Sequence, residues 1–348
     1  MKPFRTGLVV GKFAPLHHGH QLLLDEADRA CEEVVILSYS KPEFEGYGPA
    51  RRERWLRRLY PRAALQVLDD ARLAAACDAR GVARVVLPAN DASDDVHRRF
   101  VARLLQTVLC IKIDVVFTSE AYGDGFVWVL NDMGVGRSPI VHVEVDRARS
   151  RIPVSGTQIR SDIHAHRHYL HPSVYADCVE RIAVLGAEST GKTTLAQALA
   201  TRLDTCWVPE YGRELWEARD GRLAFPDMLH IARAQVERED AAVNDAFRFI
   251  VCDTTPLTTL LYAQTMFEHV DPMLVALADR FYDHVFLCEP DFEFVQDGTR
   301  RDAAFQAYQH MWYARELDRR AVSFQRLTGS VQARLGRVVH IVAPASRK

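Results

Sequence analysis

Short apolar runs separated by amphipathic stretches recur along the whole chain. In the first half these runs are rich in Val, Ile and Leu and predict strands at 8–10, 34–38, 83–87, 113–117 and 141–145. Helical spacing of apolar residues lies between them, at about 18–31 and 51–59. Strands that alternate with helices are typical of a parallel sheet covered by helices on both faces.

The same alternation starts again at Arg181. It predicts strands at 181–185, 206–209, 249–253, 285–288 and 338–342, and helices at 225–247 and 256–267. Between the two halves, residues 164–173 hold four histidines and a proline, a composition that favours a linking segment. We therefore expect two three-layer α/β domains with parallel sheets, at residues 1–172 and 179–348.

The composition changes this picture little. A chain of 348 residues with 48% hydrophobic and 26% charged residues is typical of a globular protein, and a net charge of −2 does not favour a nucleic-acid partner. The seven cysteines are dispersed, without the spacing of a zinc site, which is typical of a reducing compartment. Since no signal peptide or membrane-spanning run is found, we expect a cytoplasmic protein without a membrane partner.

The segment Gly186-Ala-Glu-Ser-Thr-Gly-Lys-Thr193 follows an apolar run and precedes a helical one. This is the P-loop pattern, whose backbone N–H groups surround phosphates while its lysine reaches the β- and γ-phosphates of ATP. Asp253 ends a later strand and, with Thr193, is the expected ligand of Mg²⁺. The predicted ATP-binding residues of this half are Gly186, Ser189, Thr190, Gly191, Lys192, Thr193 and Thr194.

A phosphoryl acceptor site is predicted by Val208-Pro-Glu-Tyr-Gly-Arg-Glu214. Glu210 resembles the base of deoxynucleoside kinases, which accepts the proton of a ribose 5′-hydroxyl. Tyr211 and Arg213 are then expected to bind the substrate. The alternative interpretation of Glu210 is a surface carboxylate paired with Arg213.

A mobile lid is predicted by Asp297-Gly-Thr-Arg-Arg-Asp302. Its Arg300 and Arg301 are expected to close on the transferring phosphoryl group, because arginine binds phosphate through two parallel hydrogen bonds. The alternative interpretation is a solvated run of charges.

Two further segments predict a second phosphate site in the first half. In Gly11-Lys-Phe-Ala-Pro-Leu-His-His-Gly-His20 the glycine allows a turn after the strand, and two imidazoles stand at a helix start, where anions bind. In Val154-Ser-Gly-Thr-Gln-Ile-Arg160 the hydroxyls can cap a helix or bind phosphate, and the arginine offers a planar fork. A metal site built on the two histidines is the alternative, but no third ligand has suitable spacing.

Together these segments resemble the HxGH nucleotidyltransferase family, with Val154 in place of its isoleucine. The resemblance implies a Rossmann-like domain that transfers a nucleotidyl group from ATP to a phosphate, with release of pyrophosphate and with Mg²⁺ on the triphosphate. His17 and His20 would then be catalytic. The implied ATP-binding residues are Gly11, Lys12, Phe13, His17, His20, Ser155, Thr157 and Arg160.

The wider family uses pantetheine phosphate, choline or glycerol phosphate, or nicotinamide mononucleotide (NMN) as the acceptor. Thr118-Ser-Glu-Ala-Tyr-Gly123 and Arg51-Arg-Glu-Arg-Trp-Leu-Arg57 are similar to the branch that uses NMN. Tyr122 and Trp128 are the expected substrate-binding residues, with Trp128 stacked on a nicotinamide ring. A core position for Trp128 is the alternative.

The order of the halves, with a nucleotidyltransferase before a P-loop kinase, resembles the bifunctional NadR-type enzymes. This resemblance implies phosphorylation of nicotinamide riboside to NMN and then adenylylation of NMN to NAD. Family members that repress transcription carry a preceding helix-turn-helix domain, whereas here the first strand begins within ten residues of Met1, so no DNA binding is expected. The alternatives are another nucleoside or phosphorylated acceptor, or one domain that senses a nucleotide; a homo-oligomer is compatible with the sequence.

Overall fold

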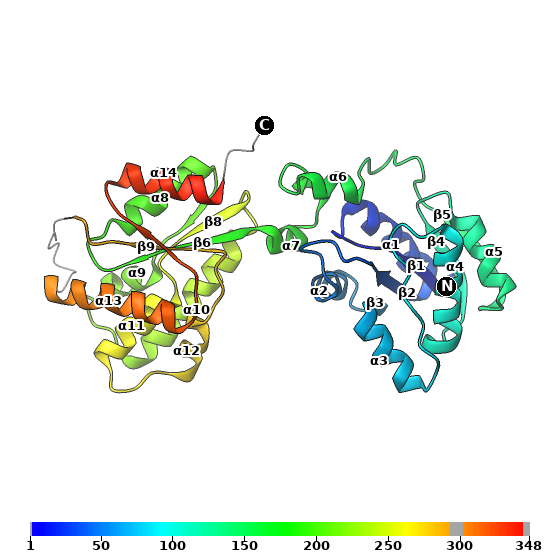
Figure 1. Cartoon of the computed structure of the whole chain (residues 1–348), viewed down its shortest axis with the longest axis horizontal. Helices are drawn as coiled ribbons and strands as arrows, with labels where there is room; N and C mark the ends of the chain where they lie inside the picture. Colours follow the sequence, from blue (N-terminus) through cyan, green and yellow to red (C-terminus); the bar gives the residue numbers. More distant parts are fainter. Residues whose placement is uncertain (1, 293–301, 344–348) are drawn as a thin grey trace. The chain divides into compact units, whose positions relative to one another are not determined.

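The computed structural model describes residues 2–292 and 302–343. The chain forms two compact units, Met1–Tyr175 and Ala176–Lys348, and each is described by itself. Each unit is a twisted parallel sheet with helices on both faces, which confirms the predicted fold class (Figure 1).

In the first unit the strand order is β3-β2-β1-β4-β5 and every pairing is parallel. The strands are β1 (Phe4–Val10), β2 (Cys31–Tyr39), β3 (Ala64–Leu68), β4 (Ile113–Thr118) and β5 (Gly136–Glu144). The chain adds strands on one side of β1 and then on the other. Ligands of such sheets bind where the order reverses, at the carboxyl ends of the two central strands, which here are β1 and β4.

The helices of the first unit pack on this sheet through alternating strand residues. They are α1 (His18–Ala30), α2 (Pro49–Leu59), α3 (Asp70–Arg80), α4 (Asp94–Arg103), α5 (Gly123–Asp132), α6 (Gly156–Ser161) and α7 (Pro172–Tyr175), with a π-helical turn at Leu104–Leu109 and a 3-10 turn at Arg167–Tyr169. Leu8, Val35 and Leu37 belong to one buried cluster with residues of α3, α4 and α5. Because successive strand residues face opposite sides, the other face of the sheet is left for the remaining helices.

The sheet of the second unit has the order β10-β9-β6-β8-β7, again fully parallel. Its strands are β6 (Glu180–Gly186), β7 (Cys206–Val208), β8 (Phe249–Asp253), β9 (His284–Cys288) and β10 (Gln325–Leu327). The central strand β6 leads directly into the segment 186–193. The order therefore reverses at β6, and the predicted P-loop lies at the point where a ligand is expected.

Two buried clusters cover the two faces of the second sheet. The helices of this unit are α8 (Lys192–Leu203), α9 (Tyr211–Ala218), α10 (Phe225–Ala242), α11 (Pro256–Met266), α12 (Pro272–Ala278), α13 (Ala303–Arg319) and α14 (Val331–Val342), and a 3-10 turn lies at Ala176–Cys178. Ala183 and Leu185 pack in one cluster with residues of α10, α11 and α13, whereas Ile182 and Val184 pack in the other with residues of α8 and α14. Figure 1 shows these two sets of helices on opposite sides of β6. The period of two along β6 thus separates the two layers.

The prediction of a strand at 338–342 was wrong, because these residues form the end of α14. The β-branched residues of this run favour a strand locally. In the fold, however, Arg334, Val338 and Val342 are the buried residues of the helix and lie four positions apart. This spacing places them on one face, where the two valines pack in the same cluster as residues of α8.

The predicted strand at 83–87 was also wrong, since these residues have no regular secondary structure. Val86 is 72% exposed while Leu87 is buried, so the segment has only one apolar side and no partner strand. The strand beside β2 is instead β3, which the sequence pattern did not predict. The helix predicted at 225–247 ends at Ala242, because the chain turns before Phe247 bridges to Phe249.

None of the described helices is both long and apolar enough to cross a membrane. The seven cysteines are free thiols, as their dispersed spacing predicts. Four of them, Cys31, Cys77, Cys252 and Cys288, are buried. They behave as small apolar residues of the cores.

Candidate functional sites

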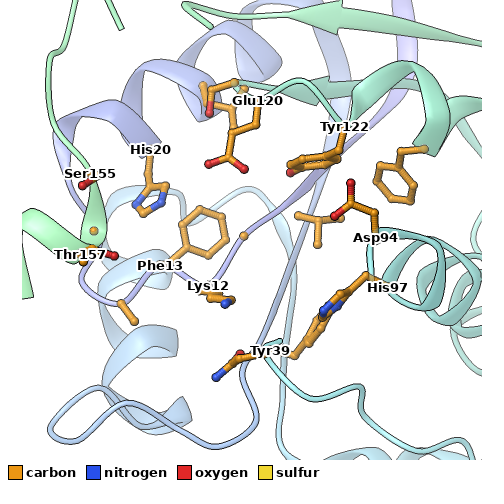
Figure 2. Close-up of a pocket in the computed structure, with 18 of the residues that line it drawn as sticks. Lys12, Phe13, His20, Tyr39, Asp94, His97, Glu120, Tyr122, Ser155 and Thr157 are labelled. Atoms are coloured by element: carbon orange, nitrogen blue, oxygen red, sulfur yellow. The ribbon is translucent and has the colours of Figure 1, made fainter. Parts of the chain in front are cut away.

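A cavity of about 490 Å³ lies at the carboxyl ends of β1 and β4, where the strand order of the first unit reverses. Figure 2 shows side chains from the loop after β1, the loop after β4 and the start of α6 pointing into it. Arg160 of α6 donates from Nη1 to the carbonyl oxygen of Ala14 at 2.6 Å. The two predicted phosphate motifs, which are far apart in the sequence, therefore meet at one site.

The histidines of the first motif form a reciprocal cap at the start of α1. Nδ1 of His17 accepts the backbone N–H of His20 at 3.3 Å, and Nδ1 of His20 accepts the N–H of His17 at 3.4 Å. Their rings stack with centroids 3.7 Å apart. Because a neutral imidazole that accepts at one nitrogen carries its proton on the other, both rings hold a proton at Nε2.

Both histidines are uncharged. Burial, and after it the neighbouring ring of His20, lowers the pKa of His17 below its usual range. Burial lowers the pKa of His20 to about 3. The site therefore offers neutral N–H donors rather than imidazolium charges near neutral pH.

Four cationic side chains of the described residues line the first cavity, Lys12, Arg98, Arg149 and Arg160, and two of them share an aromatic partner. The ammonium group of Lys12 and the guanidinium of Arg160 lie over the ring of Phe44, at 5.6 and 4.1 Å from its centroid. Burial and the charge of Arg160 lower the pKa of Lys12. An aromatic face attracts both cations and so offsets their repulsion while no phosphate is bound.

The loop after β1 is held from below by Arg52 of α2, whose side chain is fully buried. Arg52 donates from Nη1 to the carbonyl oxygen of Lys12 at 3.2 Å and to Oγ of Ser38 at 3.0 Å. Its Nη2 pairs with Oε1 of Glu43 at 2.8 Å. A buried guanidinium with these partners holds the phosphate loop in place.

Most of the residues predicted for this site line the cavity. They are Gly11, Lys12, Phe13, His20, Tyr122, Ser155, Thr157 and Arg160. His17 is 5% exposed and lies behind His20, whereas Trp128 of α5 is 63% exposed and is not among the lining residues. Sequence reasoning missed Tyr39, Phe44, Asn90, Asp94, His97, Arg98 and Arg149, which also line it. The one available signal was the basic run that precedes the second motif.

The two histidines are expected to make the stability of the first unit depend on acid pH. Their pKa values are depressed in the folded chain, while an unfolded chain has histidine pKa values near ~6.5. Between about pH 6.5 and about pH 3 the unfolded state thus binds more protons than the folded state. The free energy of unfolding is therefore highest above this window and decreases as pH falls through it. Nitrogen NMR of the rings should show the Nε2–H tautomer without titration between about pH 5 and 8. A His20 ring that titrates near its usual pKa would contradict this expectation, and the variant His20→Asn identifies the signal.

The second cavity, of about 430 Å³, lies beside the P-loop of the second unit. Gly186 and Gly191 adopt φ values of +150° and +75°, and a Cβ on Gly186 would stand 2.8 Å from Oγ1 of Thr190. These two positions therefore require glycine. Lys192 begins α8 and donates from Nζ to the carbonyl oxygen of Ala187 at 2.8 Å.

The carboxylate of Asp253 ends β8 beneath this loop and is 1% exposed. Burial raises its pKa, while a hydrogen bond with Thr193 and the charge of Lys192 lower it. Its Oδ1 atom is buried without a hydrogen-bond partner. A buried, unpaired carboxylate oxygen beside a hydroxyl fits the oxygen ligands that Mg²⁺ requires, although no group of three metal-binding acids, histidines or cysteines occurs among the described residues.

Glu210 lies in the same cavity, at the start of α9. Its side chain is 19% exposed, and its Oε2 is 4.0 Å from Nε of Arg213. Burial raises the pKa of Glu210, with Lys192 lowering it and Asp253 raising it further. A carboxylate whose pKa lies closer to neutrality is a better proton acceptor near neutral pH, so this environment favours the predicted base over a surface ion pair.

Side chains from two helices hold the P-loop residue Glu188. Gln309 of α13 accepts the backbone N–H of Glu188 at 2.8 Å, and Gln306 donates to its carbonyl oxygen at 2.7 Å. Tyr262 of α11 donates its hydroxyl to Oε1 of Glu188 at 2.8 Å. These long-range bonds fix the conformation of the loop at Glu188.

Replacing Arg334 by lysine is expected to destabilise the second unit by about 2 kcal/mol. The guanidinium is 1% exposed and donates to the carbonyl oxygens of Thr190, Glu289 and Gly329. Lysine keeps the charge but cannot reach three separated carbonyls with one nitrogen, so buried acceptors lose their partners. Urea unfolding of Arg334→Lys and of the unchanged chain measures the difference in their free energy of unfolding. Arg337→Lys, a basic change on the same helix, is the control, and equal midpoints for Arg334→Lys and the unchanged chain would contradict the role.

Five of the residues predicted for the second site line its cavity, namely Gly186, Ser189, Lys192, Glu210 and Arg213. Thr190, Gly191, Thr193 and Thr194 lie in the loop and the first turn of α8. Tyr211 instead packs under Arg238 and shares a hydrogen bond with His230, at 2.9 Å. Arg300 and Arg301 of the predicted lid lie outside the described residues. Sequence reasoning missed Glu188, Trp216, Tyr262, Gln309 and Tyr313, which line the cavity.

Comparisons with known proteins agree with a chain of two α/β units, the second of which holds a P-loop. Residues 181–334 match a family described as an AAA domain. The chain is 28% identical over 313 residues to the trifunctional NAD biosynthesis/regulator protein NadR of Escherichia coli strain K12, which covers 84% of this chain and 71% of that protein. The NadR protein of Salmonella typhimurium strain LT2 gives the same identity and coverage.

Two crystal structures of NadR proteins have the same fold over the whole chain. The complex with NAD and AMP-PNP has a TM-score of 0.66 at 20% identity and covers 100% of this chain and 99% of that one. The complex with NR has a TM-score of 0.66 at 21% identity and covers 99% of this chain and 97% of that one. At these identities the likeness establishes the fold of the two α/β units and no more.

Proposed function

The chain is a homologue of the NadR proteins, and on this premise we propose that it makes NAD by salvage in two consecutive reactions. The second unit phosphorylates nicotinamide riboside to NMN with ATP. The first unit joins NMN to the adenylyl group of ATP and releases pyrophosphate. Both units use ATP as a co-substrate.

In the kinase reaction, Glu210 accepts the proton of the ribose 5′-hydroxyl as the hydroxyl oxygen attacks the γ-phosphorus of ATP. The bond from this phosphorus to the β,γ-bridging oxygen breaks, and its electron pair leaves with ADP. Lys192, which shares the cavity with Glu210, stabilises the charge on the phosphoryl oxygens. Thr193 and Asp253 would hold Mg²⁺, which neutralises phosphate charge when it is bound. Trp216 and Tyr262 line the same cavity and offer aromatic faces to the base of the nucleoside.

In the adenylyl transfer, a phosphate oxygen of NMN attacks the α-phosphorus of ATP directly. Lys12 and Arg160 hold the triphosphate, and the hydroxyls of Ser155 and Thr157 donate to it. The neutral ring of His20 contributes an N–H donor at a helix start, and His17 behind it holds that helix start in place through the reciprocal cap. Catalysis then rests on positioning and on stabilising the charge of the transition state, without a covalent intermediate.

The observation that carries the proposal is the junction of the two motifs of the first unit, seen in the bond from Arg160 to Ala14, in a chain that also holds a P-loop site. Incubation with Mg·ATP and nicotinamide riboside tests it, with products followed by chromatography. NMN that appears first and NAD that follows would support both steps. If only added NMN yields NAD, the second unit acts on another nucleoside or senses a nucleotide. If neither product forms, the proposed pathway is wrong.

A further inference from the structure

A turn between β5 and α6 brings a cation to the first cavity that neither motif contains. The carboxylate of Asp146 accepts the backbone N–H groups of Ser150, Arg151 and Ile152 at 2.9–3.1 Å, and the Ser150 hydroxyl at 3.0 Å. Within this turn, Arg149 donates its N–H to the carbonyl oxygen of Asp146 at 2.8 Å and has a φ of +51°. The backbone at Arg149 is thus held in place, and its side chain lines the cavity.

The guanidinium of Arg149 lines the first cavity beside the loop after β4, where its Nη2 is 3.5 Å from Oε1 of Glu120. Burial is the main cause that lowers the pKa of His17 and His20, and the charges of Arg149 and Arg160 lower the pKa of both rings further. Figure 2 shows the carboxylate of Glu120 pointing into the cavity.

The second motif occupies a different part of the same site. Figure 2 shows Ser155 and Thr157 on the opposite side of His20 from Glu120. Arg160 donates from Nη2 to Oγ1 of Thr157 at 3.0 Å, so this cation belongs with the hydroxyls of α6. The cavity is thus lined by Arg160 beside the hydroxyls of α6 and by Arg149 beside Glu120, while a third arginine of the lining, Arg98 of α4, is paired with Asp94 at 3.1 Å.

Adenylyl transfer brings two phosphate groups together, and each requires a cation because their charges repel. Lys12 and Arg160, which share the ring of Phe44, stand at the triphosphate position. Arg149 has only a long contact with Glu120, and both side chains are about half exposed. Such a pair contributes little to stability, whereas a phosphate offers arginine two parallel charge-assisted hydrogen bonds.

We propose that Arg149 is a further catalytic residue of the first unit. Its guanidinium leaves Glu120 and binds the acceptor phosphate. This inference rests on the proposed adenylyl transfer. A non-bridging oxygen of that phosphate forms a bond to the α-phosphorus of ATP. The bond from this phosphorus to the pyrophosphate oxygen breaks, and its electron pair leaves with pyrophosphate. Arg149 stays protonated throughout, and Asp146 acts as a positioning residue.

Steady-state kinetics of Arg149→Gln test this assignment. We expect the specificity constant kcat/KM for NMN to fall about 10²-fold, while KM for ATP changes less than twofold and Arg149→Lys restores part of the loss. The matched control is Arg147→Gln, which removes a charge from the same turn at a residue outside the cavity lining, paired with Glu144 at 3.5 Å. A rise in KM for ATP instead, or equal behaviour of Arg149→Gln and Arg147→Gln, overturns the proposal.

The variants of Asp146 and Glu120 give two further signatures. Asp146→Ala should raise KM for NMN, and Asp146→Asn should raise it less. The double variant Asp146→Ala/Arg149→Gln should have the same KM for NMN as Arg149→Gln alone, because the turn acts through the arginine. Glu120→Gln should lower KM for NMN about twofold to fivefold, since the phosphate no longer displaces a carboxylate. Two results would contradict the proposal that Arg149 exchanges Glu120 for the acceptor phosphate. One is a double variant in which the effects of Asp146→Ala and Arg149→Gln on KM for NMN add, and the other is a rise in KM for NMN in Glu120→Gln.

Calorimetric binding of NMN separates this inference from the proposed reaction. If the unchanged chain binds NMN, Arg149→Gln weakens that binding and no NAD forms, the reaction is wrong while the role of Arg149 in phosphate binding stands. If NAD forms but Arg149→Gln binds NMN as tightly as the unchanged chain, the assignment of Arg149 is wrong and the reaction stands. Kinase turnover of the second unit should be the same in every variant, and urea unfolding of each variant verifies that the first unit is folded.

Discussion

Replacing Lys192 by alanine is expected to lower the phosphorylation of nicotinamide riboside about 10²–10³-fold, while NAD formation from added NMN is unchanged. Lys192 lies in the lining of a cavity that also holds Arg213, Glu188 and Glu210, above the buried Asp253. Without Lys192, Arg213 is the cation left among the described lining residues to oppose the charge that develops on the phosphoryl oxygens, and Arg213 is already 4.0 Å from Glu210. Initial rates of both reactions, measured on one preparation, test the expectation.

The matched control for this prediction is Arg202→Ala, which removes an exposed cation from the last turn of the same helix, α8. It should leave both reactions unchanged, because Arg202 does not line the cavity. If Lys192→Ala lowers both reactions equally in a folded protein, the assignment of one reaction to each unit is wrong.

Changing His20 to asparagine is expected to lower NAD formation from NMN about 10²–10³-fold and to leave the kinase reaction unchanged. The substitution removes the Nε2–H donor, which the shorter asparagine amide does not replace at that position; in the unchanged chain the low pKa of about 3 that burial causes keeps the His20 ring uncharged. Asparagine keeps an oxygen that can accept the backbone N–H of His17, so the start of α1 retains its cap. The rates of NAD formation at saturating NMN and ATP measure the effect.

His18→Asn is the comparison for His20→Asn, because His18 is also in the first turn of α1 but does not line the cavity. Its rates should match those of the unchanged chain. An equal loss in the two variants would mean that the helix start, rather than the His20 ring, supports the reaction. A loss of kinase activity in His20→Asn would argue against independent sites.

Local sequence patterns predicted the structure correctly where the residues that determine it lie within one short segment. The P-loop is an example, because glycines at positive φ, a strand before it and a helix after it lie within one short stretch. The strands β1, β2, β4, β6, β8 and β9 are further examples. Their runs of buried residues are long enough to identify a strand that is covered on both faces.

The same reasoning failed where the neighbours of a segment decide its structure. The run at 338–342 contains β-branched residues, yet it becomes the end of α14 because Val338 and Val342 pack against α8. The segment 83–87 has strand-like residues, yet β3 takes the place beside β2. Tertiary packing outweighs local preference in both cases, since β-propensity is a weak and context-dependent term.

By itself, then, the sequence determined two parallel α/β units and the motif residues that stand next to strand ends, because these depend on local spacing. Only the tertiary structure decided that Arg52 supports the loop at Lys12, that Arg334 binds the carbonyl of Thr190, and that Arg149 enters the first cavity. The residues of the first two pairs are 40 and 144 positions apart in the chain. An arginine acquires such a role from the carbonyls and charges that folding brings around it, and no periodicity in the sequence records which these will be.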